Sequence, residues 1–65
     1  MAYGTVSVVD TNNYFVMVTP DQGGGDVTLD RQILQGAGIT IDDLKKDDRV
    51  SFDLVSGSVR NLRRV

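Results

Sequence analysis

Apolar and polar residues alternate in two stretches of the chain, as they do in strands that bury one face. Residues 49–56 read RVSFDLVS, and residues 26–30 read DVTLD. In the longer stretch, the positions expected to face inward are Val50, Phe52 and Leu54. In the shorter stretch, Val27 and Leu29 are expected inside, with Asp26, Thr28 and Asp30 facing solvent. The alternation therefore predicts two half-buried β-strands.

Three more stretches are rich in the β-branched and aromatic residues that favour strands. They are YGTVSVVD at 3–10, YFVMVT at 14–19 and VRNLRRV at 59–65. The second and third strands are joined by DQGGG, whose consecutive glycines allow the positive φ angles of a hairpin connection. Gly57 and Ser58 are expected to form the two-residue turn before the last strand.

The segment between the third and fourth strands has a different pattern. Residues 31–38, RQILQGAG, are predicted to form a short helical turn that ends at the glycines. Residues 39–48 are predicted to form a charged loop. The apolar residues expected to anchor this segment are Ile33, Leu34, Leu44 and either Ile39 or Ile41.

Short strands with a long connection after the third predict an all-β fold. The architecture that fits is a five-stranded antiparallel barrel of the oligonucleotide-binding (OB) type, closed on itself, with residues 1–65 as its single domain. A chain of this length buries only about 60% of its unfolded surface, so the core is expected to be small. The residues expected in that core are Val6, Val18, Val27, Leu29, Ile33, Val50, Phe52 and Leu54.

The composition excludes several classes of site. The chain has neither cysteine nor histidine, so it can form neither a disulfide framework nor a Cys/His zinc site. Its formal net charge is −2, which is not the basic footprint of a strong phosphate binder. Apolar runs are far shorter than the roughly 20 residues of a membrane span. No apolar signal region follows Met1, so we expect a cytoplasmic domain without membrane contact.

Several motifs together resemble a bacterial cold-shock domain. They are GTV at 4–6, TPDQGGGDV at 19–27, RVSFDL at 49–54 and Asn-Leu at 61–62. The likeness runs from one end of the chain to the other, with a short insertion near residues 41–43 and a shortened loop after Gly57. It implies the same OB-type barrel.

Cold-shock domains bind single-stranded RNA or DNA by stacking bases on aromatic side chains of their first three strands, and the likeness implies the same surface here. The positions that match this surface are Ser7, Val8, Asn13, Phe15, Met17, Thr28, Asp30 and Arg31. Only Phe15 keeps an aromatic ring at its place. Each stacked base is worth about 1–3 kcal/mol, and Asp30 repels phosphate, so we expect weak binding of single-stranded nucleic acid. Arg31 is expected to contact a ligand or to pair with Asp30 or Asp26.

The same strands allow a second interpretation. Val8, Phe15 and Met17 would then form an exposed apolar patch of the kind that binds a partner protein or a second copy of the chain. In that case the domain is a cold-shock-type scaffold without nucleic-acid binding.

Residues next to this surface are expected to serve the fold. Tyr14 alternates with Phe15 and should lie in the core or at its rim. Val9 and Val16 stand where the family has phenylalanine and glycine, so the volume lost at one position is partly regained at the other. We expect these two valines to meet inside the barrel.

The remaining residues give no catalytic signature. The GGGD run lacks the lysine and the helix of a phosphate-binding loop. Asp26 and Asp30 have no accompanying acid, base or pocket, so neither an enzyme nor a cofactor is predicted. The spacing of the acidic residues at 42–48 matches no EF-hand calcium loop.

Basic residues gather toward the end of the chain. They are Lys45, Lys46, Arg49, Arg60, Arg63 and Arg64. One interpretation is a relocated phosphate track, and the other is a solvated face that balances Asp42, Asp43, Asp47 and Asp48.

Overall fold

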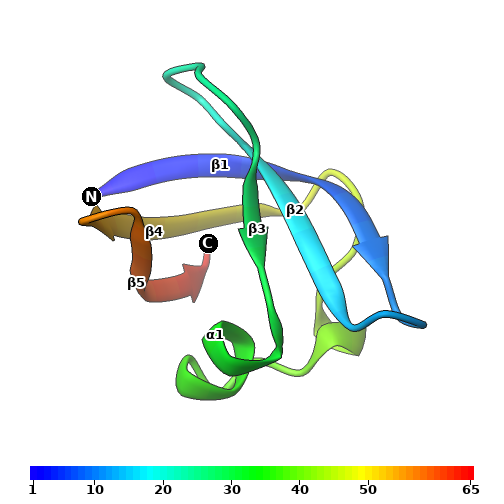
Figure 1. The fold of residues 1–65 in the computed structure, drawn as a ribbon. Helices are drawn as coiled ribbons and strands as arrows, with labels where there is room; N and C mark the ends of the chain where they lie inside the picture. Colours follow the sequence, from blue (N-terminus) through cyan, green and yellow to red (C-terminus); the bar gives the residue numbers. More distant parts are fainter.

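The computed structural model describes residues 1–65 as one antiparallel sheet of five strands with little helix (Figure 1). In chain order the elements are β1 (Ala2–Asp10), β2 (Phe15–Pro20), β3 (Val27–Leu29), α1 (Arg31–Gly36), the 3₁₀ helix η1 (Ile41–Asp43), β4 (Arg49–Val55) and β5 (Ser58–Arg64). The predicted strands, the short helix after the third strand and the all-β class are confirmed.

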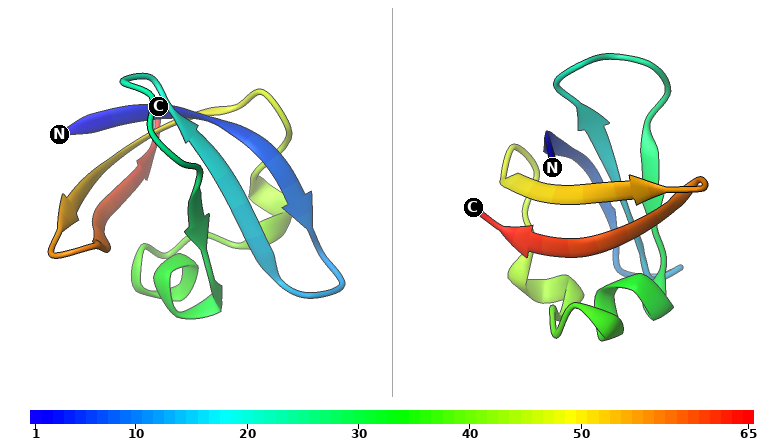
Figure 2. Two further views of the ribbon diagram at one scale, coloured as in Figure 1. Left: turned by 45° about the horizontal axis from the view of Figure 1, so that its top comes forward. Right: turned by 90° about the vertical axis from the view of Figure 1, so that its left-hand side faces the viewer.

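The strands follow the order β3-β2-β1-β4-β5 across the sheet, with β1 at its centre. The sheet is strongly curled, so its two edge strands flank a common opening that has α1 beneath it (Figure 2). No ladder joins β3 to β5. The predicted five-stranded antiparallel sheet is therefore confirmed as a curled, barrel-like sheet, but its predicted closure is wrong, because the edges of β3 and β5 stay unpaired.

β1 is the strand shared by both halves of the sheet. Residues 4–10 pair with β2, and residues 2–5 pair with β4. A Cβ atom at Gly4 would lie 2.5 Å from Cγ1 of Val18 and 3.0 Å from the carbonyl oxygen of Thr19. The glycine of the GTV motif is therefore required because the neighbouring chain approaches so closely.

Two rows of aliphatic side chains line the inner face of β1, β2 and β3. Cross-strand neighbours are Val6, Val18 and Val27 in one row and Val9, Val16 and Leu29 in the other. Val9 and Val16 lie directly opposite each other against the core, which confirms their predicted contact. Residues opposite each other in this way have Cβ atoms about 5 Å apart. The two side chains therefore share one space, and a larger side chain on one strand requires a smaller one on the other.

The core is centred on Phe52, which is almost fully buried. Its other buried members are Val6, Val16, Val18, Leu29, Leu34, Ile39, Ile41, Leu44, Val50 and Leu62. Both Ile39 and Ile41 are buried, so the loop before β4 has both anchors rather than one. Val27 and Ile33 are half-buried at the periphery of the core.

Leu54 is not in the core, and its predicted burial is wrong. Its side chain is 53% exposed. The pairing of β4 with β5 shifts register between Ser51 and Asp53, and beyond this point the hairpin extends past the rest of the sheet (Figure 2). Burial does not alternate along β4, since Val50, Ser51 and Phe52 are all buried, and no layer lies opposite Leu54 to cover it.

The turn of this hairpin lies one residue earlier than predicted. Val55 pairs with Ser58, so the two turn residues are Ser56 and Gly57, with φ angles of 51° and 79°. Positive φ at both positions is the type I′ geometry that matches the right-handed twist of the strands.

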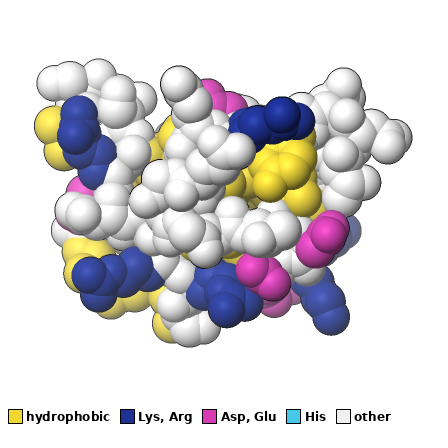
Figure 3. Space-filling model, turned by 90° about the horizontal axis from the view of Figure 1, so that it is seen from below, with side chains coloured by type: hydrophobic (Ala, Val, Ile, Leu, Met, Phe, Trp, Pro, Cys, Tyr) yellow, Lys and Arg dark blue, Asp and Glu magenta, His cyan; other side chains and the backbone are white.

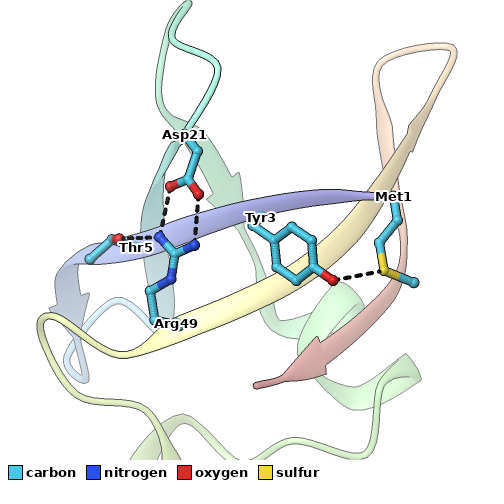
Figure 4. A network of polar contacts seen from close by, with 5 residues as sticks. All are labelled: Met1, Tyr3, Thr5, Asp21 and Arg49. Carbon is cyan, nitrogen blue, oxygen red and sulfur yellow. Dashed lines mark hydrogen bonds and ion pairs between the residues drawn. The ribbon is translucent and has the colours of Figure 1, made fainter.

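A polar network ties β4 to the first part of the chain (Figure 4). The Arg49 guanidinium donates to both carboxylate oxygens of Asp21, at 2.7 and 2.6 Å, and to Oγ1 of Thr5 at 3.0 Å. The N-terminal amine of Met1 lies 3.2 Å from the Asp53 carboxylate. These are the two ion pairs of the molecule, and both connect segments far apart in sequence.

Candidate binding surface

The outer face of β1, β2 and β3 carries half of the eight predicted binding residues. Val8, Met17 and Thr28 form one row across the three strands. Thr28 is exposed and Leu29 is fully buried, so the predicted register of the third strand is confirmed. Val8 is 43% exposed, whereas Met17 is half-buried. We use "outer face" for these three residues together with Phe15.

A β-bulge places Val8 on the outer face. The β1–β2 register shifts between Val6 and Val8, so Ser7 is the extra residue. Val6 points inward, and without the bulge Val8 would point the same way. The Ser7 hydroxyl donates to the carbonyl oxygen of Met17 at 3.2 Å, so its polar group is engaged within the sheet.

Phe15 has carboxylates on both sides. Its partner on β1 is Asp10. On the other side, the β2–β3 register pairs Val16 with Leu29, and continuing it by one residue brings Asp30 beside Phe15. The Phe15 ring therefore lies in an acidic setting, which disfavours phosphate.

Asp10 also holds the turn between β1 and β2. Its Oδ1 accepts the backbone N–H groups of Asn12 and Asn13, at 3.1 and 3.0 Å, and its Oδ2 accepts the Asn13 side-chain amide at 3.0 Å. The hydrogen bonds from Asn13, and then that from Asn12, stabilise the charged form and lower the pKa of Asp10. Asn13, a predicted binding residue, is thereby used to fix the turn.

Asp30 has a similar structural use. It is the N-cap of α1, and its Oδ1 accepts a hydrogen bond from the backbone N–H of Ile33 at 3.0 Å. The carboxylate nevertheless remains exposed, so its negative charge still faces solvent near the outer face.

Arg31 stacks on Tyr14 and pairs with neither Asp30 nor Asp26. Its Cζ atom lies 4.6 Å from the centroid of the Tyr14 ring. Tyr14 is half-buried and packs against the core, which confirms its predicted position at the rim. Its φ angle of 56° departs from strand geometry, and this turns the ring toward the start of α1. The alternation pattern contains no signal for this stack, because alternation assumes extended backbone.

The outer face has little positive charge. Arg31 is the one cation beside it, whereas the other basic residues lie on β4, on β5 and in the loop before β4. Arg64 contacts the carbonyl oxygen of Asp43, and Arg49 pairs with Asp21. On the underside of the molecule, basic and acidic side chains are interspersed around small apolar areas and form no continuous basic field (Figure 3).

Two of the four acidic loop residues serve as local caps. Asp43 accepts the backbone N–H of Thr40 at 3.3 Å, and Asp48 accepts that of Lys45 at 3.0 Å. Nowhere do three His, Cys, Asp or Glu side chains gather as ligands for a metal ion would. Neither helical segment has the length and apolar character needed to cross a membrane.

Comparisons with protein-family models, with curated proteins and with solved structures give no match. The resemblance to cold-shock domains thus stays a prediction from the motifs at 4–6, 19–27, 49–54 and 61–62.

Proposed function

We propose that this domain binds single-stranded nucleic acid weakly, through Phe15 and Met17 on the outer face and the Arg31–Tyr14 stack beside them. The observation that carries the proposal is the row Val8–Met17–Thr28 lying next to Phe15 on a sheet face where Val8 and Thr28 are exposed and Phe15 and Met17 are half-buried. Flat sheet surfaces with aromatic side chains are a common platform for unstacked bases, and Arg guanidinium planes serve the same purpose.

The number of stacking groups sets the expected affinity. Phe15 and Arg31 are the two planar groups available beside Met17. At about 1–3 kcal/mol for each stacked base, two such groups correspond to a dissociation constant near the millimolar range. Asp10 and Asp30 weaken binding further, because they lie close to Phe15.

The charge distribution sets the expected salt dependence. A protein that neutralises Z phosphates of a single strand loses affinity with a log–log slope of about −0.7Z. Since Arg31 is the one cation at the outer face, we expect a shallow slope corresponding to about one phosphate. A basic groove with several lysines would give a much steeper slope.

Fluorescence anisotropy of a labelled oligo-pyrimidine tests the proposal directly. The chain is titrated at low and moderate salt beside Phe15→Ala and a matched control, Val55→Ala. Val55 is 49% exposed at the tip of the β4–β5 hairpin, away from the outer face. The proposal predicts weak binding that Phe15→Ala abolishes and Val55→Ala preserves. Equal binding by all three proteins would contradict it.

The exposure of Val8 beside Met17 supports a second candidate, contact with a protein or a second copy of the chain through the same patch. Sedimentation of the same proteins separates the two candidates. Self-association that Val8→Ser removes, with no oligonucleotide binding, would favour protein contact.

A further inference from the structure

A groove runs along the opening between the two edge strands of the sheet. It consists of two hollows of about 570 and 550 Å³, which share Gln32, Ile33 and Val59 as lining residues. β3 and α1 form one wall, and the β4–β5 hairpin forms the other. We call it the seam groove. It adjoins the outer face at Thr28, which lines it, whereas Val8, Phe15 and Met17 do not.

The walls of the seam groove include unpaired backbone. β5 is an edge strand with β4 on one side and no strand on the other. Such an edge offers free N–H and C=O groups to an added strand. Asn61 has a φ angle of 55°, and the β4–β5 register shifts nearby, so the regular part of this edge is the segment Ser58–Arg60.

Apolar side chains lie beside this segment. Leu54 is 53% exposed, and Val59 and Ile33 are half-buried. All three line the same hollow. They provide a place for an apolar side chain of a strand that pairs with Ser58–Arg60.

The charges of the groove differ between its two ends. Arg60 and Arg63 line the end next to α1, and neither forms an ion pair or a side-chain hydrogen bond. Asp26 and Asp30 line the end next to β3. A nucleic-acid backbone is negative along its whole length and would be repelled at the β3 end. A second copy of β5 would bring arginine against arginine. The occupant that fits is a protein segment with both apolar and acidic residues.

We propose that the seam groove binds an extended peptide segment that adds as a strand to Ser58–Arg60, with an apolar side chain against Leu54 and Val59 and carboxylates on Arg60 and Arg63. Backbone hydrogen bonds supply the pairing, and the side-chain contacts select the sequence, as in other cases of strand addition. This binding is independent of the nucleic-acid binding proposed above.

The test uses NMR titrations of the isotopically labelled chain with blocked seven-residue peptides. The first alternates valine and glutamate, and the second alternates valine and lysine. The third has the side chains of the first but an N-methylated backbone at alternate residues, so it cannot pair as a strand. We expect the first peptide alone to bind, with shift changes concentrated on the amides of residues 27–29, 32–33 and 58–63.

Charge reversal provides the matched protein variants. Arg60→Glu with Arg63→Glu should weaken binding of the valine–glutamate peptide roughly tenfold or more and should create binding of the valine–lysine peptide. Lys45→Glu with Lys46→Glu makes the same change in net charge outside the groove and should leave binding unchanged. The dispersion of the amide spectrum checks that each variant is folded.

Four outcomes would overturn the proposal. In the first, no peptide binds at millimolar concentration. In the second, the N-methylated peptide binds as well as its parent, which would indicate charge attraction without strand pairing. In the third, the shift changes map to Phe15 and Met17. An oligo-pyrimidine that shifts residues 58–63 would assign the groove to nucleic acid instead, and would also contradict it.

Discussion

The Asp30 carboxylate accepts a hydrogen bond from the backbone N–H of Ile33, so one side chain both begins α1 and carries negative charge next to Phe15. Substitutions can separate these two effects. Asp30→Asn keeps a good N-cap and removes the charge, so we expect near-unchanged stability and tighter binding of an oligo-pyrimidine. Asp30→Ala should lower the free energy of unfolding by about 1 kcal/mol. Urea denaturation measures the stability of the two variants, and anisotropy titration measures their binding. A loss of binding in Asp30→Asn would show that this charge does not oppose the ligand.

Gly4 is expected to be the glycine least tolerant of substitution. In Gly4→Ala the new Cβ would overlap Cγ1 of Val18, so a strand must shift, and overpacking of this kind costs typically about 1–3 kcal/mol. Gly25→Ala is the control, because a Cβ there meets nothing within 4 Å. Thermal unfolding should show a clear decrease for Gly4→Ala alone. Equal midpoints for the two variants would contradict the close approach of β1 and β2.

Aromatic substitution of the row Val8–Met17–Thr28 should create nucleic-acid affinity. Val8→Trp, Met17→Phe and Thr28→Phe together place three rings side by side across β1, β2 and β3. At about 1–3 kcal/mol for each stacked base, we expect at least a hundredfold gain for an oligo-pyrimidine, although neighbouring changes couple and the sum is not reached. The control is a variant that combines the same three substitutions with Phe15→Ala, and it tests for non-specific binding. No gain in the triple variant would place the binding surface elsewhere.

Acid should weaken the turn between β1 and β2 through Asp10. Hydrogen bonds from Asn13 and Asn12 lower the pKa of Asp10 below its ordinary value of 3.8. A carboxylate whose pKa is lower in the folded than in the unfolded state stabilises the fold when the pH is above the unfolded-state pKa. This stabilisation is lost as the pH falls through the folded-state pKa. We therefore expect Asp10→Asn to destabilise the domain at neutral pH and to have a smaller effect at pH 3 and below. Urea denaturation across this range measures the difference, and a constant difference would exclude the effect.

Alternation along the strands correctly predicts which residues of the inner face are buried wherever a second layer covers the strand. Leu29 is buried and Thr28 exposed because core residues lie under β3. Leu54 has the same alternation signal, yet it is exposed, because the hairpin extends beyond any covering layer. Burial thus depends on where a strand ends relative to its neighbours, and a local pattern does not contain that information.

The candidate site could be predicted only in part. The outer positions of Met17 and Thr28 follow from strand parity, and the structure confirms their register. The bulge at Ser7 and the positive φ angle of Tyr14 are departures from regular strand geometry, so the orientation of Val8 and the Arg31–Tyr14 stack were not predictable from parity. The unpaired edges of β3 and β5 depend on the curvature of the whole sheet.

Both chain termini end beside β4, and this makes the domain a candidate for circular permutation. Met1 contacts Asp53, and the backbone N–H of Val65 bonds to the carbonyl oxygen of Arg49, so the ends flank one strand from opposite sides (Figure 1). They are separated by roughly 16 Å, given about 3.3 Å per residue along a strand and about 4.8 Å between strands, and a flexible linker of about eight residues spans this distance. The new termini would be made by opening the chain between Lys45 and Lys46. This permutation would about halve the sequence separation of the residues that pair between β1 and β4. The permuted domain should therefore fold faster than its parent in stopped-flow measurements. An unchanged rate would mean that pairing β1 with β4 does not limit folding.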